Sequence, residues 1–148
     1  MQFLSILLMI AIILFGVMTY FNLSDPVGLG IKEKKLADLP KTPNAVSSQT
    51  DEEARFVAPL PFKGDLQASM ERVKAILDDM DRFFIHEESE TYIHAIAVTP
   101  MMRYRDDVEF FFDEEASLIH FRSASRIGYS DKGMNRKRYE AIAKIYSR

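Results

Sequence analysis

The sequence predicts an α+β domain, a two-layer sandwich of an antiparallel sheet with two helices, preceded by one N-terminal transmembrane helix. Three features lead to it: an uncharged apolar run near the N-terminus, two hairpin-like pairs of strands, and amphipathic helical patterns before and after those pairs. Antiparallel hairpins with helices packed on one face make a two-layer α+β sandwich. The 148 residues suffice for one such domain and little more.

The apolar run, residues 3–23, contains none of the chain's 19 Lys and Arg residues or its 22 Asp and Glu residues. A helix of that length spans about 30 Å, the thickness of the hydrocarbon core of a bilayer. A cleaved signal peptide is the alternative. No basic segment precedes the run, however, and no small-residue cleavage site follows it. We therefore expect residues 1–23 to be an uncleaved, single-pass anchor in the cell membrane that contacts the lipid bilayer through residues 3–23.

Residues 24–48 are expected to form an extended tether, and residues 49–148 a single α+β domain. The tether carries Pro26, Pro40 and Pro43 and shows no sustained helix or strand period. It also carries four lysines, and the positive-inside rule then places the soluble part in the cytoplasm. The chain has no cysteine, which excludes disulfides, thiol catalysis and cysteine-bound metals.

The domain begins with a predicted edge strand and a helix. Residues 56–60 favour an edge strand, because Pro59 and Pro61 cannot donate to a ladder. Asp65 is expected to cap a helix over residues 66–80. Its apolar residues, spaced three and four apart on one face, are Leu66, Met70, Val73, Ile76, Leu77 and Met80.

Two hairpins and a final helix complete the predicted domain. The first hairpin joins residues 83–87 to 91–99, and the second joins 108–112 to 117–127. The last helix is expected over 133–147, with Asp131 or Ser130 as its cap. Its apolar face is predicted to comprise Met134, Ala141, Ile142, Ile145 and Tyr146.

The densest polar block lies between the last strand and the last helix. Alternation along the strand places Arg122 and Arg126 on one face and the serines on the other. Arginine forks beside a helix N-terminus favour an anion, such as a lipid headgroup, an envelope polymer or an acidic partner. The alternative is structural: Arg122 or Arg126 pairs with an acidic residue and locks the sheet to the helix, the candidate partners being Asp131, Glu109 and Asp113. The candidate anion-site residues are Arg122, Ser123, Ser125, Arg126, Ser130, Asp131, Asn135 and Arg136.

Three histidines form a weaker candidate constellation. His86 and His94 are expected to lie nearly opposite each other on the first hairpin, and His120 lies on another strand. Imidazoles with a carboxylate suit zinc, but the spacing matches no known ligand set, so no metal is predicted.

No nucleophile elbow, phosphate loop or dinucleotide fingerprint occurs, so an enzyme is the less favoured class and no cofactor is predicted. A net charge of -3 gives no indication of nucleic-acid binding.

The soluble part resembles the bacterial and plastid family called domain of unknown function 1499. The resemblance rests on Pro43-Asn44-x-Val46-Ser47-Ser48-Gln49, on Pro59-Leu60 and on Asp106-Asp107-Val108-Glu109-Phe110. It rests above all on Arg122-Ser-Ala-Ser-Arg126-Ile-Gly-Tyr-Ser-Asp131-x-Gly133-x-Asn135-Arg136-x-Arg138. The resemblance implies no reaction, substrate or catalytic residue, since the family is named for lacking them.

The resemblance also bears on the side of the membrane. The family pattern has two cysteines where this chain has Leu39 and Ala45. Their joint replacement by apolar residues implies that the two positions are close and buried, as in a disulfide in relatives. A disulfide would imply an oxidising compartment, which favours a periplasmic domain and contradicts the lysine pattern. The expected function is a membrane-anchored accessory or binding module; an envelope enzyme at the same surface and a structural subunit of a membrane complex are the alternatives.

Overall fold

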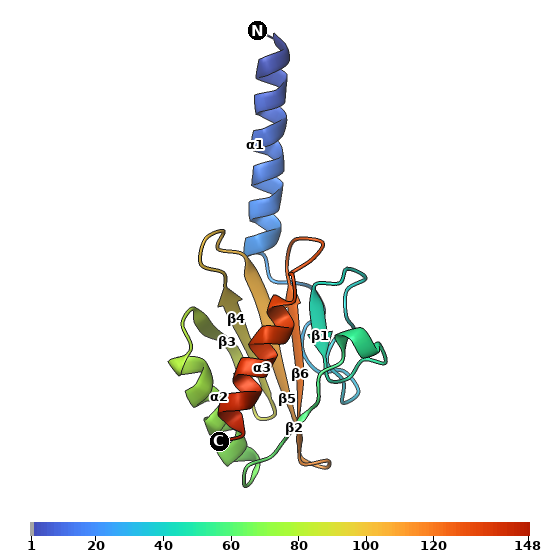
Figure 1. Cartoon of the computed structure of the whole chain (residues 1–148), viewed down its shortest axis with the longest axis vertical. Helices are drawn as coiled ribbons and strands as arrows, with labels where there is room; N and C mark the ends of the chain where they lie inside the picture. Colours follow the sequence, from blue (N-terminus) through green and yellow to red (C-terminus); the bar gives the residue numbers. More distant parts are fainter. Residues whose placement is uncertain (1) are drawn as a thin grey trace.

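The computed structural model describes residues 2–148 and shows a long helix standing on an α+β domain (Figure 1). The elements in chain order are α1 (Gln2–Leu23), β1 (Ala45–Ser47), η1 (Glu53–Arg55), β2 (Leu60–Pro61), α2 (Leu66–Asp79), β3 (Phe83–Ser89), β4 (Tyr92–Val98), β5 (Arg105–Asp113), β6 (Leu118–Ser125) and α3 (Met134–Tyr146). The predicted fold class is confirmed.

A six-stranded antiparallel sheet forms the centre of the domain. The strand order is β1-β6-β5-β4-β3, and β2 also pairs with β6. The two predicted hairpins are β3–β4 and β5–β6. β1 lies inside the range expected to be an extended tether, and Ala45 pairs with Ala124. The predicted edge strand is shorter than expected, because only Leu60 and Pro61 pair with β6.

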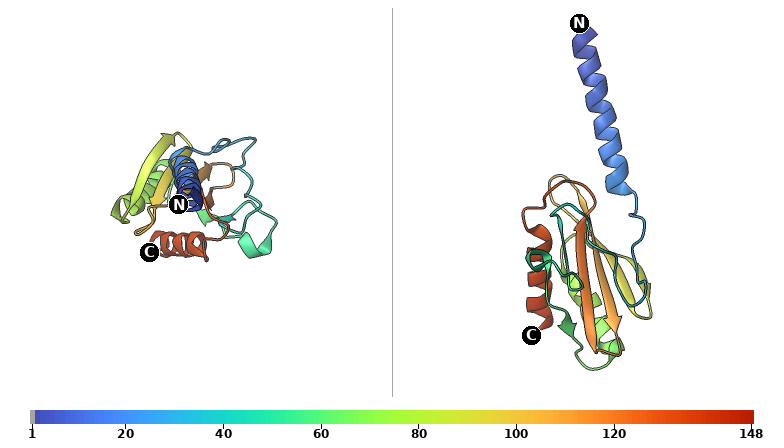
Figure 2. Two further views of the ribbon diagram at one scale, coloured as in Figure 1. Left: turned by 90° about the horizontal axis from the view of Figure 1, so that it is seen from above. Right: turned by 90° about the vertical axis from the view of Figure 1, so that its right-hand side faces the viewer.

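Helices α2 and α3 cover one face of the sheet (Figure 2, right). The face of α2 predicted from the apolar spacing is confirmed, since its buried residues include Met70, Val73 and Leu77. Asp65 caps α2 as expected, and its Oδ1 accepts the amide hydrogen of Ala68 at 2.8 Å. That bond satisfies one of the amide groups that the first turn of a helix leaves unpaired.

Helix α3 buries a different face from the one predicted. Met134, Ala141 and Ile145 are exposed, and of the expected face only Ile142 and Tyr146 are buried. Asn135 is fully buried instead. The difference arises because the N-terminal end of α3 packs on the sheet through hydrogen bonds, so polar residues occupy positions that an apolar pattern does not reveal.

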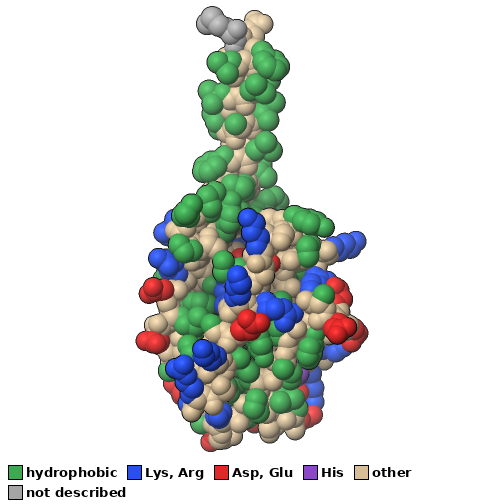
Figure 3. Space-filling model, viewed as in Figure 1, with side chains coloured by type: hydrophobic (Ala, Val, Ile, Leu, Met, Phe, Trp, Pro, Cys, Tyr) green, Lys and Arg blue, Asp and Glu red, His purple; other side chains and the backbone are tan. Residues whose placement is uncertain are grey.

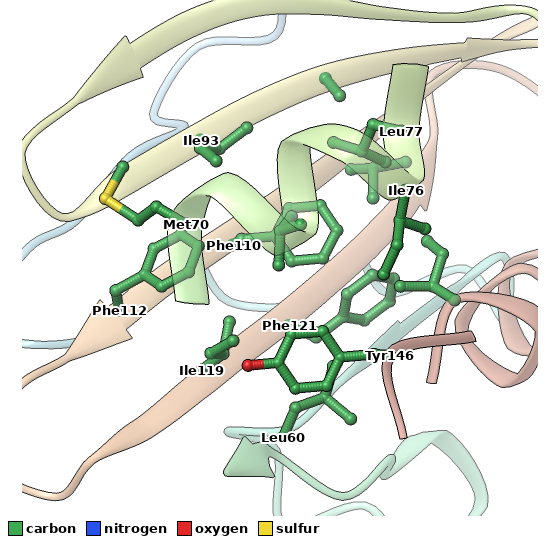
Figure 4. Packing of buried hydrophobic residues seen from close by; sticks show 14 of the residues in the cluster. Leu60, Met70, Ile76, Leu77, Ile93, Phe110, Phe112, Ile119, Phe121 and Tyr146 are labelled. Carbon is green, nitrogen blue, oxygen red and sulfur yellow. The ribbon is translucent and has the colours of Figure 1, made fainter. Parts of the chain in front are cut away.

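Aromatic and aliphatic side chains fill the space between the sheet and the two helices (Figure 4). Phe110 and Phe121 meet edge to face with ring centroids 5.3 Å apart, a preferred aromatic geometry. Leu77 from α2 and Tyr146 from α3 close the core above the strands. These residues explain why α2 and α3 share one face of the sheet.

The opposite face of the sheet is covered by residues 24–39, which we call the cover segment. It leaves the C-terminal end of α1 and passes along this outer face (Figure 2, right). Its Ile31 and Leu36 pack with Tyr92 and Phe111 of the sheet. α1 itself extends away from the domain, has no buried residue, and is long and apolar enough to cross a membrane.

Candidate functional site

The outer face carries two buried carboxylates that β5 places two residues apart. Alternation along the strand directs Phe110 into the core and both Asp107 and Glu109 to the outer face. Both carboxylates are nearly inaccessible, at 2% and 0% exposure. A buried charge must be paired and hydrogen-bonded to be tolerated. Arginines of the polar block described in the sequence analysis provide the pairing.

Arg122 pairs with Glu109 beneath the cover segment. Arg122 Nη1 donates to Glu109 Oε2 at 2.6 Å, and Arg122 Nη2 donates to the carbonyl oxygen of Asp38 at 3.4 Å. Glu109 Oε1 accepts from the Tyr92 hydroxyl at 2.7 Å and from the amide of Gly30 at 2.9 Å. Burial, together with the charge of Glu109, raises the pKa of Tyr92, so its hydroxyl stays protonated and donates. The cluster therefore attaches the cover segment to the sheet.

Arg126 pairs with Asp107 at the end of the sheet nearest α1. Arg126 Nε and Nη2 donate to the two carboxylate oxygens of Asp107 at 2.9 and 2.8 Å, a bidentate fork. His94 Nε2 lies 2.8 Å from Asp107 Oδ1. Burial tends to raise the pKa of Asp107, but its hydrogen bonds with His94 and Arg126 and the Arg126 charge outweigh this and leave the pKa lowered.

The same guanidinium also binds the C-terminal end of α1. Arg126 Nη1 donates to the carbonyl oxygens of Ser24 at 2.9 Å, Leu23 at 3.3 Å and Asn22 at 3.4 Å. The last carbonyls of a helix have no partner within the helix and carry partial negative charge, which a cation satisfies. Arg126 Nη2 also pairs with Asp25 at 2.9 Å. Arg126 thus joins the long helix, the cover segment and the sheet.

Asn22 makes a second attachment between α1 and the sheet. Its side-chain Nδ2 donates to the carbonyl of Arg103 at 3.0 Å, and its Oδ1 accepts from the amide of Arg105 at 2.8 Å. A side-chain amide that uses both ends in this way fixes the rotation of α1 as well as its position.

The remaining predicted residues lie on the other face of the sheet or at the surface. Asn135 Nδ2 donates to Ser125 Oγ, to Asp131 Oδ2 and to the carbonyl of Asn44, and its Oδ1 accepts from Ser123 Oγ and from Arg138. This network joins α3 to β6 and to the residue before β1. Arg136 and Ser130 lie apart from it: Arg136 donates to the carbonyls of Ala54 and Phe56, and Ser130 Oγ accepts from the amide of Lys132.

The eight candidate residues therefore do not form one surface. Arg122 and Arg126 share the outer face, and Ser123 and Ser125 point to the other, as the alternation predicts. Their side chains are only 8% and 1% exposed, and both guanidinium groups are engaged in ion pairs. The anion-binding role predicted for these residues stays a prediction. Of the pairs that the structural alternative named, Arg122–Glu109 is present. Arg126 pairs instead with Asp107 and Asp25, and it attaches the sheet to α1 rather than to α3.

The histidines occupy two separate places. His86 and His94 have ring centroids 5.2 Å apart across β3 and β4, and His86 Nε2 lies 3.2 Å from Asp25 Oδ2. A bulge between Ile85 and Glu87 makes Glu87, not His86, the partner of His94. His120 lies beside Ser48, whose Oγ is 3.3 Å from its Nδ1. Within residues 2–148, no group of three or more metal-ligating side chains comes together.

Sequence reasoning missed a cavity of about 670 Å³ at the junction of α1 and the sheet, here called the junction cavity. Its walls come from the last turns of α1, from β3, β4 and the start of β5, and from the segments that follow β4 and β6. They consist of Phe15, Met18, Thr19, Asn22, Leu23, Phe84, His86, Ile96, Val98, Met102, Arg103, Tyr104, Arg105 and Ile127. One signal was available: β4 is apolar at almost every position, which is typical of a strand covered on both faces.

Comparison with known proteins gives one match. The family described as "Protein of unknown function (DUF1499)" matches residues 35–145, three quarters of the chain. The chain belongs to the DUF1499 family. No curated protein and no solved structure matches it.

The DUF1499 match includes the sheet, α2, most of α3 and both outer-face ion pairs, but it excludes α1 and the first part of the cover segment. Arg126 therefore belongs to the DUF1499 part, whereas the carbonyls and the Asp25 carboxylate that it binds lie before that part. The junction cavity has one wall inside the matched range and one wall, α1, outside it.

Proposed function

We propose that this protein is a single-pass, membrane-anchored binding module whose domain is held in a fixed orientation on its anchor. The observation that carries the proposal is the set of bonds made by Arg126, which binds Asp107, Asp25 and the carbonyl oxygens at the C-terminal end of an uncharged helix. A flexible tether would let the domain turn freely. A helix end bound at Arg126 and Asn22 instead moves with the sheet as one unit.

The surroundings of the junction support a place at the membrane surface. Hydrophobic side chains cover the visible side of α1 and continue onto the adjoining end of the domain, where basic side chains stand beside them (Figure 3). Met101 and Met102, between β4 and β5, are 91% and 58% exposed, and Tyr129, after β6, is 75% exposed. Apolar and aromatic groups beside Lys and Arg are typical of a surface in contact with lipid headgroups.

Binding is favoured over catalysis because the two buried carboxylates of the outer face are already paired with arginines. Asp107 is matched by Arg126 and Glu109 by Arg122, so neither carboxylate is left as an accessible acid or base. The soluble domain is proposed to lie on the periplasmic side, as the family resemblance implies.

Two measurements on the full chain test the anchoring and the orientation. If α1 is an uncleaved anchor, the full-length chain stays in the membrane fraction after alkaline carbonate extraction; release of a shortened chain contradicts the anchor.

Because the chain has no cysteine, single introduced cysteines are unique labels. A cysteine at exposed Lys132 is expected to react with a membrane-impermeant maleimide from the periplasmic side, and reaction only after cell lysis places the domain in the cytoplasm.

A second prediction concerns the fixed orientation. Spin labels at Ile10 and Glu140, both exposed, measure the distance between α1 and α3 in lipid nanodiscs. We expect a narrow distance distribution that broadens in Arg126→Ala and in Asn22→Ala, because each removes bonds that hold the end of α1. Arg136→Ala, which removes bonds only within the domain, is the control. An equally narrow distribution in both junction variants would overturn the fixed orientation.

A further inference from the structure

The junction cavity combines apolar walls with cationic groups that have no partner among residues 2–148. Phe15, Met18 and Leu23 of α1 face Phe84, Ile96 and Val98 of the sheet across it. Its volume, about 670 Å³, lies within the range of about 300–1,000 Å³ that is usual for sites that bind small molecules. The cavity is therefore large enough for a ligand.

Arg103 and Arg105 differ from the other arginines near the junction. The guanidinium of Arg126 is committed to Asp107, Asp25 and the end of α1. Within the described chain, residues 2–148, neither the Arg103 nor the Arg105 guanidinium makes a hydrogen bond or ion pair, although their backbone groups bind Asn22. Two unpaired cations lining an apolar cavity are complementary to a ligand with a negative head and an apolar body.

The position of the cavity points to the source of such a ligand. One wall is formed by the last turns of the apolar helix, at the level where it leaves the proposed bilayer. Met102 of the wall is itself 58% exposed, so apolar surface of the wall also faces the outside. A molecule that resides in the bilayer therefore needs to cross little water to enter.

We propose that the junction cavity binds one acyl chain of a membrane phospholipid and that Arg103 and Arg105 bind its anionic phosphate. This proposal rests on the membrane anchoring proposed above. A planar guanidinium binds phosphate oxygens with two parallel hydrogen bonds, and the apolar walls replace the hydrocarbon surroundings of the chain. An anionic headgroup is preferred over a zwitterionic one, because the latter brings its own cation to the two arginines.

A single introduced tryptophan reports whether an acyl chain enters the cavity. The chain contains no tryptophan, so Phe84→Trp places a unique fluorophore on the cavity wall, and Phe56→Trp places one at an exposed site outside the cavity. The full-length variants are placed in nanodiscs that contain phosphatidylglycerol with brominated acyl chains, which quench nearby indole. We expect strong quenching at position 84 and weak quenching at position 56.

Two variants test the parts of the proposed site. Val98→Phe fills the cavity from the β4 side and is expected to relieve the quenching at position 84 while the melting temperature of the domain is retained. Replacing Arg103 and Arg105 with glutamine is expected to reduce the preference for brominated phosphatidylglycerol over brominated phosphatidylcholine by about five-fold for each arginine. Lys144→Gln with Arg148→Gln removes the same charge at the far, C-terminal end and is the matched control.

Three outcomes would overturn the proposal. Equal quenching at positions 84 and 56 shows that no acyl chain enters the cavity. Equal quenching by the two lipids shows that the site does not select an anionic head. A dimer in native mass spectrometry, combined with loss of quenching, shows that a second copy of the chain fills the cavity. Release of the chain from the membrane by alkaline carbonate would instead overturn the membrane anchoring. Failure of the lipid site and failure of the proposed function are therefore distinguishable.

Discussion

Arg122 and Glu109 form an ion pair that is closed off from water by the cover segment. Glu109 is completely buried, and its two oxygens accept from Arg122, Tyr92 and the amide of Gly30. A carboxylate in such a place is tolerated only while all of these donors remain. The pair is therefore a sensitive point for the stability of the domain.

Replacing Arg122 with alanine leaves Glu109 buried without a cation. Removal of one partner of a buried pair destabilises a protein by about 3–5 kcal/mol, because the remaining charge is uncompensated. We expect a loss of this size in the free energy of unfolding, measured by urea denaturation of a soluble form that begins at Ser24. Arg136→Ala, which removes two surface hydrogen bonds, is expected to lose about 1–3 kcal/mol at most. Equal losses would contradict a special role for the buried pair.

Asp107 makes the stability of the domain depend on pH. Its pKa in the folded protein is lowered from 3.8, so the folded state binds this proton less readily than the unfolded chain does. The stabilisation that it provides is complete above the unfolded pKa and is lost as the pH falls through the folded pKa. In urea denaturation, Asp107→Asn is expected to be less stable than the wild type at pH 7 and to approach it well below pH 3.8. A difference that stays constant over this range would show that the charge of Asp107 is not responsible.

At the scale of elements, the predicted cap of α2 was correct and that of α3 was wrong, because the N-cap of α3 is Gly133, which has no side chain to make a capping bond. Asp65 was predicted as the cap of α2 and makes that bond. The alternation that separates Arg122 from Ser123 was also predicted, since a strand directs successive side chains to opposite faces. β1 was not predicted, because three residues are too few to show a strand period.

The capping bond of Asp65 gives a prediction for α2. Asp65→Ala removes the acceptor of the Ala68 amide hydrogen, and the loss of an N-cap destabilises a helix by about 0.5–2 kcal/mol. Asp79→Ala removes the same type of side chain from the last turn of α2, where a negative charge is unfavourable with the helix dipole, and is expected to raise stability slightly, by about 0.3–1 kcal/mol at most. Comparison of the two in thermal unfolding separates the cap from a general effect of charge.

At the scale of the whole molecule, the sequence indicated Glu109 as a possible partner of the arginines, which Arg122 confirms, but it did not reveal what Arg126 binds. Arg126 was recognised as a member of a distinctive block, but its partners, the carbonyls of residues 22–24, lie about a hundred positions earlier in the chain. Backbone carbonyls carry no sequence signal. The junction cavity was missed for the same reason, because it exists only once α1 is placed against β3 and β4.

The attachment by Asn22 also determines which side of α1 is available to other molecules. Met18 and Asn22 turn toward the domain, so Ile13, Val17 and Tyr20, which lie three or four positions apart and are exposed, turn away from it. In a bilayer, a neighbouring helix that packs along this outward stripe sets the azimuth of the whole domain about the membrane normal. Lateral assembly would then orient neighbouring copies with respect to one another without any contact between their domains.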